Sequence, residues 1–128
     1  MIYLATPYIH EDKMVCEARA LAVTKAAAHF MDKGEVIYSP ITHGHAINKH
    51  MEQQVGDHKF WLNQCYFYVT NSTAIYVLGQ DGWCTSKGVR WEVETAFAFG
   101  IPVFLVDAET YELTEILKVD DWLHSIEY

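Results

Sequence analysis

Two carboxylates near the middle of the chain have the type and the spacing for chemistry on a small ligand. Glu92 falls about one turn into a helical pattern that follows the polar loop Gly79–Gly88, and Asp81 stands near the start of that loop. Ser86, near the expected N-cap, offers a hydroxyl, and Gly88 lets the backbone approach a ligand without a Cβ in the way. The amino end of such a helix directs N–H groups toward an anion. This pattern predicts half of a phosphate cradle with a carboxylate beside it.

The same residues also have plainer interpretations. Ser86 is equally explained as an ordinary helix cap, and for Glu92 the pattern alone favours an ordinary glutamate on a helix surface. Neither the Walker A pattern nor the GxGxxG dinucleotide fingerprint occurs in the chain. At about 100° per residue, Glu92 and Glu94 project about 200° apart, so only one can face the sheet. We assign Glu94 to an exposed ion pair with Arg90 and place Glu92 beside the packed stripe. That stripe is expected to contain Val89, Val93, Ala96 and Gly100.

Two rival sites would use other chemistry. A metal site could form in the histidine-bearing stretch, from His43, His45, His50, Asp57 and His58. Helical HExxH spacing is absent, and His43, expected in a loop at a strand edge, could instead contact phosphate or base. Cys84 lies in the loop and is a candidate nucleophile, although no Cys–His pairing is visible in the sequence. We predict neither a metal ion nor another cofactor.

Alternating strands and helices must position these residues. Strands are predicted at Met1–Ala5, Val36–Tyr38, Ala74–Leu78 and after Pro102 as far as Val106. Helices are predicted at Glu11–Lys33, from an N-cap at Asp57 through Val69, and after Ser86. The stretch Ile41–Gly56 has no clear period, and the tail has helical spacing at Leu113, Ile116 and Leu117, then at Trp122, Leu123 and Ile126. The expected stripes are Val15, Ala18, Ala22, Ala26 and Phe30 in the first helix and Trp61, Cys65 and Val69 in the second.

The run from Ala74 to Val106 is a βαβ unit, whose parallel strands are joined by a right-handed crossover. The whole pattern predicts a small doubly wound α/β domain, Rossmann-like or flavodoxin-like. Its mostly parallel sheet should be flanked by helices and bind ligands at the carboxyl ends of the strands.

Composition narrows the class of protein. The chain has 128 residues, 51% of them apolar, which predicts one domain over residues 1–128 with a substantial core. The net charge of −8 argues against a nucleic-acid polymer as partner, because phosphate neutralisation needs clustered cations. Three cysteines without a CxxC motif indicate a reduced, intracellular protein. With no signal peptide and no apolar run near ~20 residues, we expect a cytoplasmic protein that does not bind membranes.

One ordered set of residues resembles a known family. The set Trp83, Ser86, Gly88, Val89, Glu92, Ala96, Gly100 and Pro102, at its spacing, is similar to the signature of the nucleoside 2-deoxyribosyltransferase superfamily. That superfamily includes 2'-deoxynucleoside 5'-phosphate N-hydrolases and small phage and bacterial relatives. The opening Met1–Tyr8, Arg19, Ser39-Pro40 with His43, and Trp61 with Cys65 agree with it, so the likeness covers about residues 1–106. Two departures stand out: Ser72-Thr73 replaces the Cys-Asp that relatives often carry, and Gly79-Gln80 lengthens the loop before Asp81.

The resemblance implies an N-glycosidase that cleaves a base–sugar bond with retention of configuration. Glu92 would attack C1' and release the base, and water or a second base would resolve the glycosyl ester. Asp81 would orient the sugar or protonate the departing base, and Ser86 and Arg19 would hold a 5'-phosphate. The other implied substrate-binding residues are Tyr3, Thr6, Pro7, Tyr8, Ser39, His43, Trp83 and Gly88.

Several alternatives stay open at this point. We favour hydrolysis of a 2'-deoxynucleoside 5'-monophosphate, because Ser86 and Arg19 suit a phosphate. A transferase that exchanges bases and a module that binds nucleotides without turnover are the alternatives. The aromatic residues Tyr3, Tyr8 and Trp83 could belong to the core and not to the site walls. We expect a homo-oligomer because aromatic residues are expected on the surface and because the resemblance implies a family whose members often form oligomers.

Overall fold

The computed structural model describes residues 1–52 and 58–118. Its sheet contains β1 (Ile2–Ala5), β2 (Ile37–Tyr38), β3 (Ala74–Leu78), β4 (Val103–Val106) and β5 (Leu113–Ile116). The strand order is β2-β1-β3-β4-β5. The pairings of β1 with β2, β1 with β3 and β3 with β4 are parallel, and β5 runs antiparallel to β4. This is the flavodoxin-like strand order, so the predicted class of a doubly wound, mostly parallel α/β fold is confirmed.

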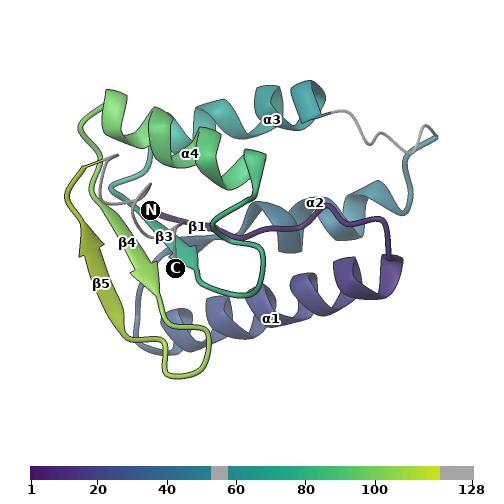
Figure 1. The fold of residues 1–128 in the computed structure, drawn as a ribbon, viewed down its shortest axis with the longest axis horizontal. Coiled ribbons are helices and arrows are strands. Elements are labelled where there is room, and N and C mark those ends of the chain that lie inside the picture. The colour runs from purple at the N-terminus through teal and green to yellow at the C-terminus, as the bar shows by residue number, and fades with distance from the viewer. Residues whose placement is uncertain (53–57, 119–128) are drawn as a thin grey trace.

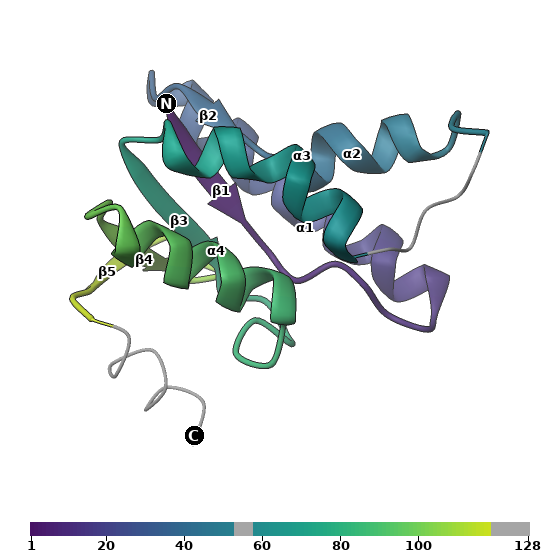
Figure 2. The same cartoon turned by 90° about the horizontal axis from the view of Figure 1, so that it is seen from above.

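Helices lie on both faces of the sheet. They are α1 (Lys13–Asp32), α2 (Pro40–Asn48), α3 (His58–Thr70) and α4 (Lys87–Ala98). Helices α3 and α4 cover one face and α1 covers the other (Figure 1). Viewed from above, α3 and α4 lie side by side over the strands (Figure 2). Within the described residues, no helix is both long enough and apolar enough to cross a membrane.

The alternation of side chains along β1 decides which residues can meet. Tyr3 and Ala5 point into the core layer under α3 and α4, whereas Leu4 points into the layer under α1. The strands β3 and β4 pair in parallel register from Ile75 with Val103 onward, and α4 crosses between them. The predicted βαβ unit is therefore confirmed, and it sets α4 directly over the row that contains Tyr3.

Two predicted elements were wrong. The aperiodic stretch after Ser39 begins with the nine-residue helix α2, so His43 lies on a helix and not in a loop. Ser39 caps this helix by accepting a hydrogen bond from the Thr42 amide at 3.3 Å, and Pro40 occupies its first turn. The tail around Leu113 is the edge strand β5 and not a helix. The predicted N-cap at Asp57 and the tail residues from Trp122 onward lie outside the described residues.

Two predicted stripes were partly wrong. In α1 the buried positions are Ala20, Val23, Ala26, Ala27 and Phe30, while Ala18 is exposed. Gly100 is exposed and stands beyond the end of α4 with φ +70°, where it forms a Schellman motif. Its amide bonds the Phe97 carbonyl, and the Ile101 amide bonds the Ala96 carbonyl. Glycine is needed at this position to end the helix.

Candidate active site

Helix α4 buries Glu92. Ser86 caps the helix by accepting a hydrogen bond from the Val89 amide at 3.2 Å. The buried face of α4 consists of Val89, Glu92, Val93 and Ala96, spaced as one helical stripe. Only 8% of Glu92 is exposed, so the interpretation of a surface glutamate was wrong. Glu94 points the other way, and its carboxylate accepts a hydrogen bond from Arg90 Nε at 2.8 Å, as predicted.

Three protonated groups meet where α4 crosses the sheet. Burial raises the pKa of Glu92 from 4.5 to about 8, and the Tyr3 hydroxyl lowers it in part. Burial and the neighbouring Glu92 and Cys65 raise the pKa of Tyr3 well above 10. Burial likewise raises the pKa of the Cys65 thiol to about 11. At neutral pH this cluster from β1, α3 and α4 is therefore largely uncharged.

The Tyr3 hydroxyl is a notable member of the cluster. The side chain is fully buried, and its hydroxyl has no hydrogen-bond partner among the described residues. Glu92 and Cys65 raise the pKa of Tyr3 both by their charge and by side-chain hydrogen bonding, although neither meets the geometry of a full hydrogen bond with the hydroxyl. A buried hydroxyl without a partner costs about 1–3 kcal/mol, which is unusual for a purely structural tyrosine. Tyr3 thus belongs to the core, as the alternative interpretation held, yet it presents a polar atom beside Glu92.

Arg19 joins two loops at the carboxyl edge of the sheet. Its guanidinium donates to the carbonyls of Ile9 at 3.1 Å and Tyr8 at 3.4 Å in the β1–α1 loop. It also donates to the Asp81 carbonyl at 3.2 Å in the β3–α4 loop. A Cβ at Gly82, which has φ +92°, would lie 2.6 Å from the Arg19 Nη2 atom, so glycine is required there. Arg19, which was predicted to bind a 5'-phosphate, therefore has its guanidinium engaged with backbone carbonyls.

Gln80 adds a second tie between the same loops. Its amide nitrogen donates to the Thr6 hydroxyl at 2.5 Å and to the Arg19 carbonyl at 3.2 Å. The Asp81 side chain is exposed. Beside these ties lies an open groove of about 420 Å³, lined by His10, Met14, Val15, Ala18, Arg19, Gln80 and Asp81.

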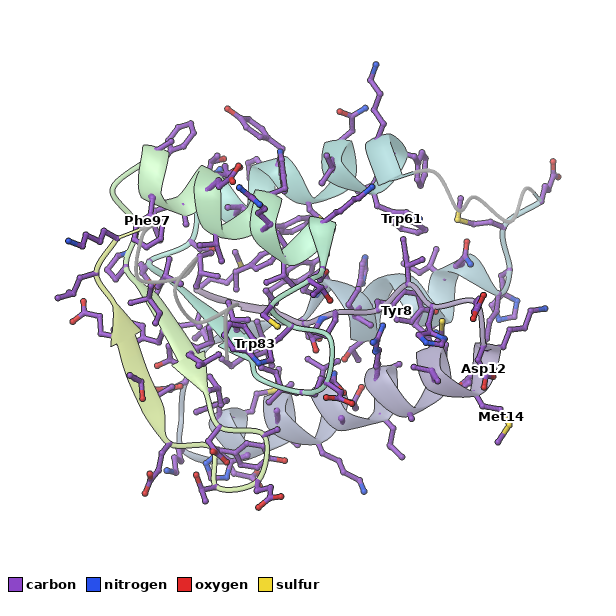
Figure 3. All side chains as sticks on the ribbon, viewed as in Figure 1. Tyr8, Asp12, Met14, Trp61, Trp83 and Phe97 are labelled. Atoms are coloured by element: carbon purple, nitrogen blue, oxygen red, sulfur yellow. The ribbon has the colours of Figure 1, made fainter. Side chains whose placement is uncertain are left out.

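A second cavity, of about 270 Å³, lies between α2 and α3. It is lined by Tyr38, Pro40, His43, Gly44, Ile47, Met51, Phe60, Trp61, Gln64, Cys65 and Tyr68. Figure 3 shows Trp61 at the amino end of α3, on the same side of the molecule as Tyr8 and opposite to Phe97. Glu92 lines neither of these two cavities. Cys65 belongs both to the wall of the second cavity and to the Glu92 cluster, so it connects the two.

A chain of hydrogen bonds links the β1–α1 loop to α1 and α2. The Tyr8 hydroxyl and His45 Nδ1 are 2.5 Å apart, and His45 Nε2 lies 3.1 Å from the Glu17 carboxylate. Lys49 Nζ is 3.5 Å from the same carboxylate. The contact with His45 is the main cause of the lowered pKa of Glu17. Tyr8 is therefore anchored to α2 by its hydroxyl.

The predicted site residues fall into three groups. Tyr3 and Glu92 meet under α4. Thr6, Tyr8 and Asp81 belong to the two tied loops, and Arg19 reaches these loops from α1. Ser39 and His43 belong to the N-cap and the body of α2. Pro7 is buried, Trp83 packs against the core layer of Tyr3, and Gly88 stands in the first turn of α4. The roles of these residues in binding and catalysis stay predictions.

Sequence reasoning missed Cys65 and Gln80 as parts of the site. Cys65 was assigned to a helix stripe and to the family resemblance but to no role in the site, and its meeting with Glu92 depends on how α3 packs on α4. Gln80 follows β3 by two positions, and this place at the carboxyl edge could have marked it. Among the described residues, no three His, Cys, Asp or Glu side chains gather in a way that could hold a metal ion.

Comparisons with known proteins identify the fold. A family model described as "Domain of unknown function (DUF1937)" matches residues 1–108. A solved structure of a 2-deoxyribosyltransferase from the psychrotolerant bacterium Bacillus psychrosaccharolyticus is similar, with a TM-score of 0.58 and 20% identity. The match covers 99% of this chain and 90% of that one. A search of curated proteins gives no match. The fold implied by the resemblance is confirmed.

Proposed function

The chain belongs to the family described as Domain of unknown function (DUF1937), and we propose that it cleaves the N-glycosidic bond of a 2'-deoxynucleoside 5'-monophosphate. The observation that carries this proposal is the buried carboxyl of Glu92, whose pKa is raised to about 8 beside the unpartnered Tyr3 hydroxyl. Titratable groups perturbed in this way are typical of catalytic sites. The similarity of the fold to a 2-deoxyribosyltransferase supports the same class of chemistry.

The proposed reaction has two displacement steps. The deprotonated Glu92 carboxylate attacks C1', the C1'–N bond breaks, and its electron pair leaves with the base, which takes up a proton. Water then attacks C1' of the glycosyl ester and gives up a proton to solvent, the C1'–O bond to Glu92 breaks, and the sugar phosphate leaves as the carboxylate is restored. The Tyr3 hydroxyl would donate a hydrogen bond to Glu92 in its ionised form. Asp81 is proposed to orient the sugar or to protonate the departing base.

The amino end of α4 is the proposed seat of the 5'-phosphate. Ser86 and the backbone around Gly88 are at this end, where the helix dipole favours an anion. Arg19 would contribute positive charge, although its N–H groups hold the two loops. Because the amino end of α4 and the positive charge of Arg19 both favour an anion, we keep the monophosphate as the favoured substrate.

Base release tests the proposal directly. The protein is incubated with each 2'-deoxynucleoside 5'-monophosphate, and free base is measured by chromatography. Glu92→Gln should lower the rate by more than about 10²-fold, the smallest effect expected of a group that takes part in the chemistry. Glu94→Gln is the matched control, because Glu94 is an exposed neighbour on the same helix, and it should keep the wild-type rate. If the wild type releases no base from any substrate, with or without an acceptor base, the proposal fails.

Base exchange is the second candidate, because the similar solved structure is of a 2-deoxyribosyltransferase. If a transferase, the protein should form a new nucleoside or nucleotide when a second base is added, and the release of free sugar should fall. A hydrolase releases sugar at an unchanged rate. A non-catalytic binding module would release no base, and its nucleotide affinity, measured by calorimetry, would be unchanged in Glu92→Ala.

A homo-oligomer remains part of the proposal. Tyr66, Phe67 and Phe99 expose aromatic surface on α3 and just beyond α4. The Tyr66 ring lies 6.2 Å from Phe99 and 6.5 Å from Trp91, so the aromatic surface is continuous across both helices. Such a patch favours association. Sedimentation of the wild type and of Phe99→Ser, which removes an exposed member of this surface, tests it.

A further inference from the structure

The Tyr3 hydroxyl lies between two possible acceptors. Glu92 on α4 and Cys65 on α3 both act on it by charge and by side-chain hydrogen bonding, although neither completes a hydrogen bond with it. The Tyr3 side chain is fully buried, so bulk solvent is not a third partner. A hydroxyl carries one proton and can direct it to only one acceptor at a time. The carboxyl and the thiol therefore compete for the same proton.

The protonation state of Glu92 decides this competition. A hydrogen bond to an ionised carboxylate is about twice as strong as one between neutral groups, whereas a thiol sulfur is a weak acceptor. The Tyr3 hydroxyl lowers the pKa of Glu92, as a donor that prefers the charged form of the carboxyl must do. When Glu92 is protonated this preference is lost, and the sulfur becomes an acceptor that can compete.

The Cys65 thiol stays neutral over the range in which Glu92 ionises. Burial raises the pKa of this thiol to about 11, the hydroxyl of Tyr3 lowers it in part, and the charge of Glu92 adds to the rise. A thiol with a raised pKa is a poor nucleophile. Cys65 is therefore suited to hold the hydroxyl weakly and not to react.

Other charged groups do not enter the competition. Among the described residues, no lysine, arginine or histidine contributes to the pKa shifts of Glu92 and Tyr3. The next titratable groups are Tyr38 on β2 and Tyr68 on α3, whose rings stack with centres 4.1 Å apart. Burial, Cys65 and Tyr68 raise the pKa of Tyr38, so this phenol is neutral as well.

We propose that Cys65 is a positioning residue for Glu92: its sulfur holds the Tyr3 hydroxyl while Glu92 is protonated and releases it to the carboxylate when Glu92 ionises. The sulfur makes no bond to a substrate in this role. It opposes the ionisation of Glu92, because the carboxylate must take the hydroxyl from it. The relevance of this exchange to base release rests on the proposed function, whereas the exchange itself does not.

The ionisation of Glu92 tests the proposal without turnover. The carboxyl carbon of Glu92 is followed by NMR as the pH is changed, in the wild type and in Cys65→Val, which removes the sulfur and leaves no large void. The pKa of Glu92 should fall by about 0.4 to 1 pH unit, which corresponds to one neutral hydrogen bond. Cys16→Val is the matched control, because Cys16 is also a half-buried free thiol but lies on α1, and Glu92 should titrate in it as in the wild type.

A double-mutant cycle separates this role from packing. In Tyr3→Phe the hydroxyl that links the two groups is gone, so adding Cys65→Val should leave the pKa of Glu92 unchanged. A thiol that acts only by packing or by excluding water would shift this pKa equally in both backgrounds, and that result overturns the proposal. The absence of a shift in the wild-type background also overturns it. Cys65→Ala repeats the cycle with a smaller side chain if the valine variant does not fold.

Base release connects the exchange to the proposed reaction. The kcat/KM profile of Cys65→Val should move to lower pH by the same amount as the NMR titration. If the wild type releases base and this profile does not move, the positioning role is overturned. If the cycle gives the expected shifts but the wild type releases no base, the proposed function fails and the exchange of the hydroxyl stands.

Discussion

At the scale of single residues, Glu92 has two requirements that oppose each other. Burial against the sheet favours its protonated form, whereas attack on a sugar carbon requires the carboxylate. The Tyr3 hydroxyl eases this conflict, because it lowers the pKa of Glu92. The pair thus holds a carboxyl whose ionisation falls close to neutral pH.

The pH dependence of base release should report this ionisation. We expect kcat/KM to rise with pH and to level off above the pKa of about 8, because only the ionised Glu92 reacts. The profile is measured with a deoxynucleoside as well as with its monophosphate, so that ionisation of the substrate phosphate is separated from that of the protein. A profile that is flat from pH 5 to about 9 would contradict the assignment.

Stability gives an independent view of the same group. Because the folded pKa is raised above 4.5, Glu92 contributes stability that is present below pH 4.5 and is lost as the pH rises toward 8. Glu92→Gln lacks this ionisation. Between those two pH values, the melting temperature of the wild type should therefore fall relative to that of the variant.

Replacing Tyr3 by phenylalanine should separate stability from activity. The lost hydroxyl has no hydrogen-bond partner among the described residues, so we expect the free energy of unfolding to stay equal or to rise by up to about 1–3 kcal/mol. The pKa of Glu92 should rise, because the lowering contribution of Tyr3 is gone. The kcat/KM profile then shifts to higher pH. A loss of stability, with an unchanged profile, would show that the hydroxyl acts only in packing.

The sequence predicted the direction of Glu92 but not its neighbours. The 200° separation from Glu94 and the Arg90 partner were enough to decide which glutamate faces inward. Contact with Tyr3 and Cys65 depends on three elements that are distant in the chain, and no local pattern carries that information.

At the scale of elements, packing overrode local pattern in two places. Helix α2 has three polar or glycine positions in a row at Thr42, His43 and Gly44, so its period was hidden. The i, i+3, i+4 spacing of Leu113, Ile116 and Leu117 fits a helix, yet pairing with the edge of β4 gives a strand. In α1, alanines on several faces left the buried stripe ambiguous. The βαβ unit was predictable because its apolar runs indicate the two strands and its glycines indicate the loop and the helix end between them.

Gly44→Ala should stabilise α2 when the Trp61 ring shifts to make room. Helix propensity alone favours the variant by about 1 kcal/mol. The new Cβ would lie 3.3 Å from the Trp61 ring, so the ring must give way by a few tenths of an ångström. We expect an equal or higher melting temperature. Thermal denaturation checks this, and a fall in melting temperature would show that Trp61 cannot shift.

At the scale of the whole molecule, the negative net charge of the protein disfavours the approach of the favoured substrate, which is an anion. A chain with a charge of −8 repels a monophosphate over distances comparable to its own size. Local groups near the amino end of α4 must overcome this repulsion once the ligand arrives. Long-range repulsion is screened by salt more strongly than contact at close range.

Ionic strength should therefore lower the KM of a monophosphate. Between about 0.01 M and about 0.15 M salt, the screening length falls from about 30 Å to about 8 Å, which weakens the repulsion. The KM of the matching uncharged deoxynucleoside should not change, and it serves as the control. A KM for the monophosphate that rises with salt would show that nearby cations dominate binding.

The guanidinium of Arg19 has a consequence for motion. The loops after β1 and β3 are held together by this side chain and by the hydrogen bond from Gln80 to Thr6, so neither loop can leave its position without breaking both attachments. Admission and release of a ligand at this edge would then require both loops to open as one unit. Their backbone amides should exchange hydrogen with solvent at a common rate, and in the double variant Arg19→Met with Gln80→Leu the two loops should exchange independently.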